Sequence, residues 1–272
     1  RRAAQTALVQ FAPAAQRHTV EGVIACLGHE DEDVRGAAVR VLARISDGET
    51  QAVVDALALR LADQSPSIRA AATEVLDDLT HRCHAWSVHA VAGQLEHDDA
   101  SVREAANVAM CRVTLEEDSD AVAEVAARIA HVDPLIRSEA KITLEKIAPS
   151  GINDAVRALC RHFEHPDAGV RDDAVAALLA ITAPGDEGVL SLLDILLSSP
   201  LPSVRQSTVE AISKIAEPSD CAAWDRAIAH LADSDREVRW AAVAAVELLG
   251  QRCAQGLLSL DARVAAALRA TK

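Results

Sequence analysis

The sequence predicts an all-α fold, an α-solenoid built as a superhelical array of about eight antiparallel helix pairs. Three observations predict it. An arginine recurs every 34 residues, each arginine stands in one recurring phrase, and the apolar residues around it are spaced by three and four. Examples of the phrase are DEDVRGAAVRVLARI, SPSIRAAATEVLDDL and DAGVRDDAVAALLAI. A fixed period of this length is typical of a solenoid, in which each repeat buries its apolar face against its neighbours.

The second helix of each repeat, called helix B, contains the arginine. Apolar residues stand three, seven and ten positions after it, as Ala38, Leu42 and Ile45 do after Arg35. These offsets lie on one stripe of a helix with 3.6 residues per turn. The small residue in the first of these columns predicts a close approach by a neighbouring helix.

A first helix, called helix A, precedes helix B. Its apolar residues stand fifteen, twelve and eight positions before the arginine, as Val20, Val23 and Leu27 do in the first complete repeat. Steps of three and four again indicate an amphipathic helix. Helices A and B are therefore expected to lie antiparallel, joined by short turns.

The turn before helix B carries a column of acidic residues four positions before the arginine, with Ser65 in one repeat and Leu201 as the exception. Aspartate and serine at a helix start accept hydrogen bonds from free backbone N–H groups. The arginine stands in the first turn of helix B, where a cation opposes the helix dipole by about 0.3–1 kcal/mol. The acidic column, of the same or the adjacent repeat, is the natural partner to offset that cost. The predicted structural ladder consists of Arg35, Arg69, Arg103, Arg137, Arg171, Arg205, Arg239, Asp31, Asp99, Asp133, Asp167 and Asp235.

The phrase D-x-x-V-R-x-x-A-x-x-x-L-x-x-I, on the second helix of a two-helix unit, resembles the HEAT repeat, and in particular its phycobilin-lyase-like subclass. The tetratricopeptide repeat shares the period of 34, but the chain has no Tyr and two Phe, so its aromatic positions are missing. The resemblance implies an internal hydrogen-bonded ladder of Asp and Arg. It also implies a protein-binding scaffold whose helices B line the concave side.

The whole chain, residues 1–272, is expected to form a single continuous HEAT-like α-solenoid. Residue 1 is the arginine of a helix B without its helix A, so the first repeat is half a repeat, with Phe11 in its core. The array is therefore expected to be part of a longer one. Towards the C-terminus, GLLSLDARVAAALRATK suggests a helix A shifted by about two residues.

The composition restricts the classes of partner. The net charge of −14 disfavours nucleic acid and anionic membranes and favours basic partners. No apolar stretch is long enough to span a membrane. The six cysteines show no pairing spacing, which is typical of a reducing compartment, so an intracellular, cytoplasmic location is expected.

Candidate metal and catalytic residues are few. His81, Cys83, His84 and His89 form the densest group, with the first three expected in a turn and His89 on helix A, and nothing else completes a tetrahedral zinc site. His29 with Glu30 is similar to the His–Glu pairs of the HEAT-like deoxyhypusine hydroxylases, but several such pairs would be needed. No nucleophile–base or phosphate-loop motif has a credible context. We therefore predict no enzyme, no metal and no cofactor.

The exposed face of helix B remains as the candidate binding surface. Positions one, five, eight and nine after each arginine should point away from the core. Apolar residues on this face are candidates for a partner groove, and acidic residues would form its rim. The predicted partner-binding residues are Val108, Ile142, Leu179, Trp240, Glu74, Asp77 and Asp78.

The functional prediction is a non-enzymatic protein–protein interaction scaffold that binds its partner on the concave helix-B surface. The partner is expected to be basic or to carry an apolar helix, or to be a neighbouring subunit of a larger complex. The alternative that the resemblance implies is a lyase-like or chaperone-like accessory factor, for example for a chromophore-bearing phycobiliprotein. A third class, a helical-repeat DNA-binding module, would require a basic stripe, which the charge balance disfavours.

Overall fold

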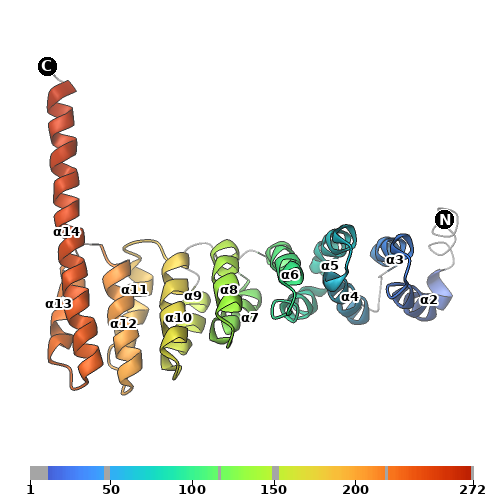
Figure 1. Cartoon of the computed structure of the whole chain (residues 1–272), viewed down its shortest axis with the longest axis horizontal. Helices are drawn as coiled ribbons and strands as arrows, with labels where there is room; N and C mark the ends of the chain where they lie inside the picture. The colour runs from blue at the N-terminus through green and yellow to red at the C-terminus, as the bar shows by residue number, and fades with distance from the viewer. Residues whose placement is uncertain (1–11, 46–49, 116–117, 149–152, 218–219, 271–272) are drawn as a thin grey trace. The chain divides into compact units, whose positions relative to one another are not determined.

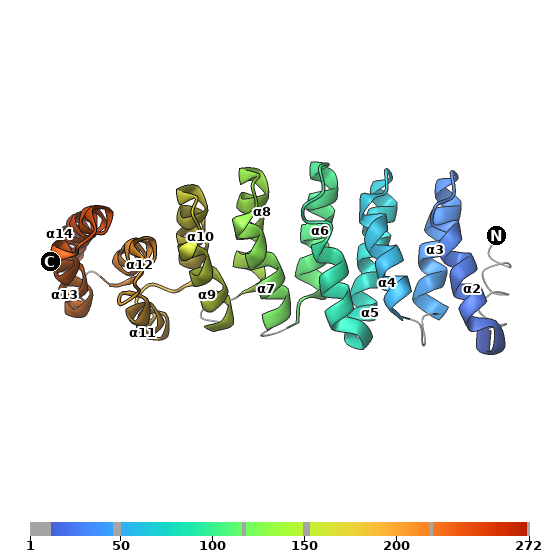
Figure 2. The ribbon, with the colours of Figure 1, turned by 90° about the horizontal axis from the view of Figure 1, so that it is seen from below.

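The fold is an α-solenoid of paired helices, seen in a computed structural model (Figures 1 and 2). The structure describes residues 12–45, 50–115, 118–148, 153–217 and 220–270; among them the side chains of 12–17, 50, 82, 153 and 255–270 are not described. All regular elements in these ranges are helical. The predicted half repeat with Phe11 lies outside the described residues.

The chain divides into two compact units, Arg1–Arg128 (unit 1) and Ile129–Lys272 (unit 2). We describe each unit by itself, and the single continuous array over residues 1–272 stays a prediction. The helices of unit 1 are α2 (Ala12–Cys26), α3 (Glu32–Ile45), α4 (Thr50–Ala58), η1 (Leu59–Ala62), α5 (Pro66–Ala92), α6 (Ala100–Val113) and α7 (Ser119–Ala127). Helix A packs on helix B in the contacts of α2 with α3 and of α4 with α5.

The range of α5 contains two helices, helix B of one repeat and helix A of the next, which meet at a break at Cys83. Only Cys83 leaves the helical region, with φ −146° and ψ 44°, and it marks a kink. The Cys83 thiol donates to the carbonyl of Leu79 over 3.1 Å. The junction between the two repeats thus lies at Cys83, within the predicted inter-repeat turn, but the turn is limited to this residue, and His81 and His84 lie in the helices on its two sides.

Unit 2 continues the pattern of paired helices. Its helices are α8 (Pro134–Ile147), α9 (Asn153–Cys160), η3 (Arg161–Glu164), α10 (Ala168–Ile181), α11 (Glu187–Leu196), α12 (Pro202–Ile215), α13 (Cys221–Ala229), η4 (His230–Ala232) and α14 (Arg236–Ala270); η2 (Arg128–Ala130) stands at the border of the units. The helices B lie in the order α8, α10, α12 and α14, each in contact with the next.

Helix α14 is 35 residues long, whereas α8, α10 and α12 have 14 residues each. It continues as one helix to Ala270, through the segment predicted to form a shifted helix A. That prediction was wrong, because no turn separates the segment from helix B (Figure 1).

The predicted core columns are confirmed. In the column seven positions after the arginine, Leu42, Leu76 and Leu178 are fully buried. In the small-residue column, Ala106 and Ala174 have no exposed surface, which fits the predicted close approach of a neighbouring helix. Because these columns repeat, each helix pair buries the same stripe against its neighbours within its unit.

The aspartates four positions before the arginine cap helix B. The Oδ1 atoms of Asp99, Asp133 and Asp167 accept from the backbone N–H two residues later over 2.8, 2.9 and 2.8 Å. Leu201 occupies this position before α12 with φ −85° and ψ 120°, almost the backbone geometry of Asp99, but provides no side-chain cap. Helix α12 therefore lacks a side-chain N-cap, although the backbone at Leu201 has the geometry that a capping aspartate adopts.

Replacement of Leu201 with aspartate is expected to raise the free energy of unfolding by about 0.5–2 kcal/mol, the usual value of an N-terminal cap. The change also removes a leucine that is 43% exposed. Urea unfolding followed by circular dichroism measures it. Asp167→Leu is the matched reverse variant and should lose stability; a variant at 201 no more stable than the wild type would contradict the capping argument.

Candidate functional site

The arginine column has a repeated structural geometry. In each of the seven described repeats, Nη1 of the arginine donates to the carbonyl oxygens six and five residues before it; for Arg103 these are the carbonyls of His97 and Asp98, at 2.9 and 3.0 Å. These bonds fasten the turn between helix A and helix B to the start of helix B.

Two arginines also hold a carboxylate of the following repeat with both remaining nitrogens. Nε and Nη2 of Arg35 donate to Asp63 over 2.8 and 2.9 Å, and those of Arg205 donate to Asp233 over 2.8 Å each. Each aspartate stands six residues before the next arginine. The two-pronged geometry is the strong form of an arginine–carboxylate pair, and it ties one helix pair to the next.

The carboxylate partners of the ladder differ from those predicted. Arg35 pairs with Asp63, Arg205 with Asp233, and Arg137 with Asp173, which lies on helix α10. For these three arginines the predicted assignment to the aspartate column at offset minus four was wrong. The physical reason is that the carboxylates of the predicted column already accept hydrogen bonds from the backbone N–H groups at the start of helix B.

Histidine stands at offset minus six in four of the repeats. The Nδ1 atoms of His29, His97, His131 and His165 accept from the backbone N–H two residues later over 3.0–3.2 Å. The carboxylates of Asp63 and Asp233 accept from the corresponding N–H over 2.9 Å. A histidine at this position therefore shapes the turn, and the His29–Glu30 pair belongs to this structural column.

The ladder changes the acidity of its carboxylates. The hydrogen bonds from Arg205 lower the pKa of Asp233 well below its usual value, although burial opposes the change. Burial also opposes the lowering of the pKa of Asp63, and the hydrogen bonds from Arg35 and from the Ser65 N–H outweigh it. Both carboxylates are thus held in the charged form.

The exposed face of helices B, called the B face, carries the predicted apolar residues. It comprises the exposed residues one, five, eight and nine positions after the arginine. In unit 2, Ile142 on α8 is 48% exposed, Trp240 on α14 is 52% exposed, and Leu179 on α10 is half-buried. The guanidinium carbon of Arg236 lies 3.9 Å from the centroid of the Trp240 ring, a cation–π contact that leaves much of the ring uncovered.

Between these apolar residues the B face of unit 2 is acidic. Burial and the negative charge of Glu210 on α12 raise the pKa of Asp172 on α10 above its usual value, and the cations Arg171 and Lys214 oppose the change only in part. Lys214 forms an ion pair with Glu210 over 2.5 Å. Burial is the largest cause of the raised pKa of Asp172, and repulsion by Glu210 adds to it.

The B face of unit 1 combines the other predicted residues. Val108 on α6 is 47% exposed, and Glu74 stands at the same offset, five after the arginine, on the adjacent helix α5. Asp77 is half-buried and Asp78 is exposed on the same helix. The structure therefore brings an exposed valine and acidic residues to one face of two neighbouring helices.

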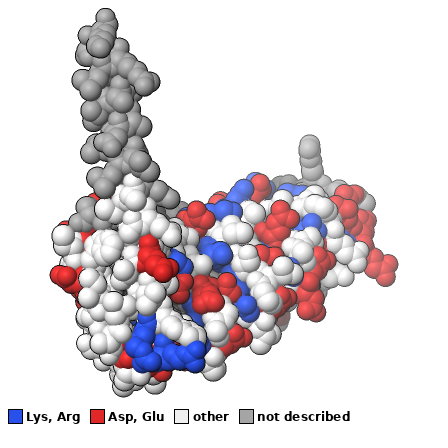
Figure 3. Space-filling model, turned by 60° about the vertical axis from the view of Figure 1, so that its left-hand side comes forward, with Lys and Arg blue, Asp and Glu red and all other residues white. Residues whose placement is uncertain are grey.

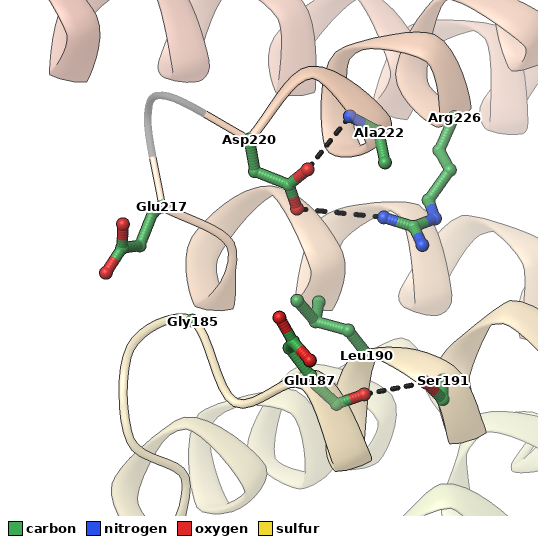
Figure 4. A pocket seen from close by; sticks show the side chains of 8 residues that line it. All are labelled: Gly185, Glu187, Leu190, Ser191, Glu217, Asp220, Ala222 and Arg226. Carbon is green, nitrogen blue, oxygen red and sulfur yellow. Dashed lines mark hydrogen bonds and ion pairs between the residues drawn. The ribbon is translucent and has the colours of Figure 1, made fainter.

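A second surface feature is a cleft of about 470 Å³ between helices α11 and α13 in unit 2 (Figure 4). Gly185 borders it with φ +77°, in the left-handed region that favours glycine. Arg226 in the cleft is neutralised by Asp194 over 2.7 Å and by Asp220 over 3.8 Å. The hydroxyl of Ser191 donates to the backbone carbonyl of Glu187 over 2.7 Å, the ordinary bond of a serine within a helix.

The residues considered as metal ligands are dispersed in structural contacts. His84 Nε2 pairs with the buried Asp118 over 2.8 Å, and His89 pairs with Glu124 over 3.2 Å. Among the described residues, no three His, Cys, Asp or Glu side chains group as a metal site would require. Burial raises the pKa of the Cys160 thiol to about 12, so this thiol stays protonated at neutral pH.

Charges of both signs are mixed over the face shown in Figure 3. This face shows no continuous basic stripe of the kind that a nucleic-acid surface requires.

Within the described part of the chain, no helix has both the length and the apolar character needed to cross a membrane.

Comparison with known proteins gives one family match. The model of HEAT repeats matches residues 1–77. No curated protein matches the sequence.

Solved structures similar to the chain include an engineered protein, human deoxyhypusine hydroxylase and importin beta. An engineered protein is 22% identical, with coverage of 85% of this chain and 68% of its own and a TM-score of 0.32. Human deoxyhypusine hydroxylase is 18% identical, with coverage of 91% and 89% and a TM-score of 0.35. Importin beta is 15% identical, with coverage of 90% of this chain and 36% of its own and a TM-score of 0.42.

The family match is to HEAT repeats in general, so the phycobilin-lyase-like subclass stays a prediction. The matched segment contains Arg35, Arg69 and their phrases, and the same phrase continues at the same period through α6, α8, α10, α12 and α14. The match over residues 1–77 and the repeated helix pairs support a HEAT-repeat family for this chain.

Proposed function

We propose that this HEAT-repeat chain is a non-enzymatic scaffold that binds another protein along its B face. The observation that carries the proposal is the exposure of Ile142 and Trp240 at positions of helix B that the core does not use. Large apolar side chains that remain exposed beside charged ones are typical of protein-binding surfaces. A row of parallel helices offers such a surface over several repeats.

The charge of the B face favours a partner with basic side chains. The negative charge of Glu210 adds to the effect of burial in raising the pKa of Asp172, so the two carboxylates repel each other on this face. A lysine or arginine of a partner would relieve this repulsion, while its apolar residues cover Ile142 and Trp240. An amphipathic helix with one apolar and one basic face provides both, in the manner of helix-in-groove recognition.

Ile142→Glu is expected to abolish capture of a stoichiometric partner from a native lysate by the tagged full-length chain. The matched control is Ile195→Glu, which introduces the same charge at an isoleucine that is 71% exposed on helix A. Circular dichroism of both variants checks that the fold is kept. The measurement is the amount of partner retained, followed by titration of the purified partner.

The two variants together show which surface binds the partner. If the partner is lost with Ile142→Glu and kept with Ile195→Glu, the B face is the binding surface. If Ile195→Glu loses the partner instead, binding uses helices A. Equal capture by all three proteins would contradict the proposal.

A further inference from the structure

A groove of about 450 Å³ lies between two consecutive helices A of unit 1, the part of α5 after Cys83 and helix α7. We call it the A groove. Its apolar lining consists of Ala85 and Val88 from α5 and of Ala123 and Ala127 from α7. The three alanines are exposed and Val88 is buried beneath them. The groove is therefore an apolar hollow on the exposed side of helices A, separate from the B face.

A further repeat of the array does not cover this groove. Repeats stack on the two ends of a solenoid. The A groove instead runs along the exposed side of the stack, between two helices A that already contact each other. It is therefore an outward surface whatever the number of repeats in the array.

A similar hollow recurs in unit 2, in the cleft between α11 and α13. Five lining positions of the A groove, moved by three repeats of 34 residues, are Glu187, Leu190, Ser191, Ala222 and Arg226, and all five line that cleft (Figure 4). The two volumes are also similar, about 450 and 470 Å³. The packing of consecutive helices A therefore produces the hollow, and the residues at its lining positions determine what it can bind.

The wall that α7 contributes to the A groove is acidic. Glu124 already has partners, since its carboxylate pairs with Arg128 over 2.7 Å and with His89 over 3.2 Å. Burial opposes the lowering of the pKa of Glu124, and the hydrogen bonds from His89 and Arg128 outweigh it. Asp120 is exposed, and within the described residues it forms no ion pair. Asp120 is therefore the carboxylate that the cation of a partner can reach.

The dimensions and chemistry of the groove favour a peptide segment. From Asp120 to Ala127 the helix extends by about 10 Å, the length of about three residues of an extended chain. The alanine and valine side chains offer no hydrogen-bonding group, so an apolar side chain fits there better than a polar one. The net charge of −14 and the free carboxylate at the rim favour a segment that is also basic.

We infer that the A groove binds a segment of a partner protein in which an aliphatic side chain stands beside a lysine or arginine. The aliphatic side chain would lie on Ala85, Ala123 and Ala127. The ammonium or guanidinium group would pair with Asp120. This surface adds a second docking site to the B face, and the two sites can be tested independently.

The probe is a library of random dodecapeptides displayed on phage. The library is first passed over the immobilised Ala127→Trp chain, in which an indole ring fills the groove. The phage that do not bind are then captured by the wild-type chain, so the recovered peptides depend on the A groove. We expect these peptides to share a lysine or arginine beside a leucine, isoleucine, valine or methionine.

The affinity of an enriched peptide, synthesised with a fluorophore, is then measured by fluorescence anisotropy. Asp120→Lys should weaken binding about tenfold, because it replaces an attraction with a repulsion, and Asp120→Asn should weaken it less. Ala222→Lys and Ala229→Trp are the matched controls, since they place the same side chains at the equivalent positions of unit 2. Both controls should leave the affinity unchanged, and circular dichroism checks that every variant is folded.

Three results would overturn the inference: no enriched peptide, enriched peptides without a basic residue, or an affinity that Asp120→Lys leaves unchanged. A dimer in sedimentation that Ala127→Trp dissociates would mean that a second copy of this chain occupies the groove, with the same consequence. Ile142→Glu should not affect the peptide, so failure at the A groove is distinguishable from failure at the B face.

Discussion

Phe163→Ala is expected to lower the free energy of unfolding by about 3–5 kcal/mol, the usual cost of a large cavity in a core. Phe163 lies in η3 (Arg161–Glu164) with no exposed surface, and η3 contacts both α10 of its own repeat and α12 of the next. The lost side chain therefore removes packing inside one repeat and packing between two repeats at once.

The between-repeat part of the effect can be measured separately. In a solenoid, stability is approximately a sum of terms for single repeats and for their interfaces. Hydrogen exchange of Phe163→Ala should therefore show loss of protection in α12 as well as in α10. Phe163→Leu is the control, because leucine occupies this position in other repeats, as Leu61 and Leu95. This variant should lose much less stability than Phe163→Ala. A loss confined to α10 would contradict the bridging role.

The helix pairs could be predicted because the period and the apolar spacing repeat without insertion. Leu42, Leu76 and Leu178 are buried as their shared offset indicated, since seven copies of one stripe leave no ambiguity about which side faces the core. The short break at Cys83 is less visible in the sequence. The segment Thr80–Ala85 contains neither Gly nor Pro, whereas the linker before α11 contains Pro184 and Gly185.

The carboxylate partners of the arginines were harder to predict. Offset minus six carries Asp only at 63 and 233, with histidine or serine elsewhere, so no single residue type marks it. The aspartate column at offset minus four is regular, so it was predicted to pair with the arginines. Its carboxylates instead accept hydrogen bonds from the backbone N–H groups at the helix starts. A column that mixes Asp, His and Ser has one shared property, an acceptor atom close to the backbone, and that property is visible only in the structure.

The exposed residues of the B face followed from the offsets alone, as Val108, Ile142 and Trp240 show. The opposition of Asp172 and Glu210 did not. Their offsets, one and five after the arginine, belong to the predicted face, but their mutual effect depends on the neighbouring positions of α10 and α12. Electrostatic contacts between repeats require the geometry of the stack, which the period does not specify.

Arg205→Ala is expected to destabilise unit 2 by about 2 kcal/mol at neutral pH, the usual effect of losing charged hydrogen bonds. The side chains of Arg205 and Asp233 are only 13% and 8% exposed, so solvent replaces the lost bonds poorly. The variant also leaves the Asp233 carboxylate nearly buried without its cation, a costly state. Asp233→Asn in the Arg205→Ala background should recover part of the loss, because the amide keeps the backbone contact to Asp235 without the charge.

The pH dependence of the same variant identifies the ion pair as the cause. The pKa of Asp233 is lowered in the folded wild type, so its contribution to stability is complete above the unfolded value of 3.8 and disappears as the pH falls below it. The difference in unfolding free energy between the wild type and Arg205→Ala should therefore be constant from neutral pH down to about pH 4–5 and shrink at lower pH. Urea unfolding across this range measures it. A difference that stays unchanged under acid would assign the role of Arg205 to its carbonyl contacts, because those contacts do not titrate.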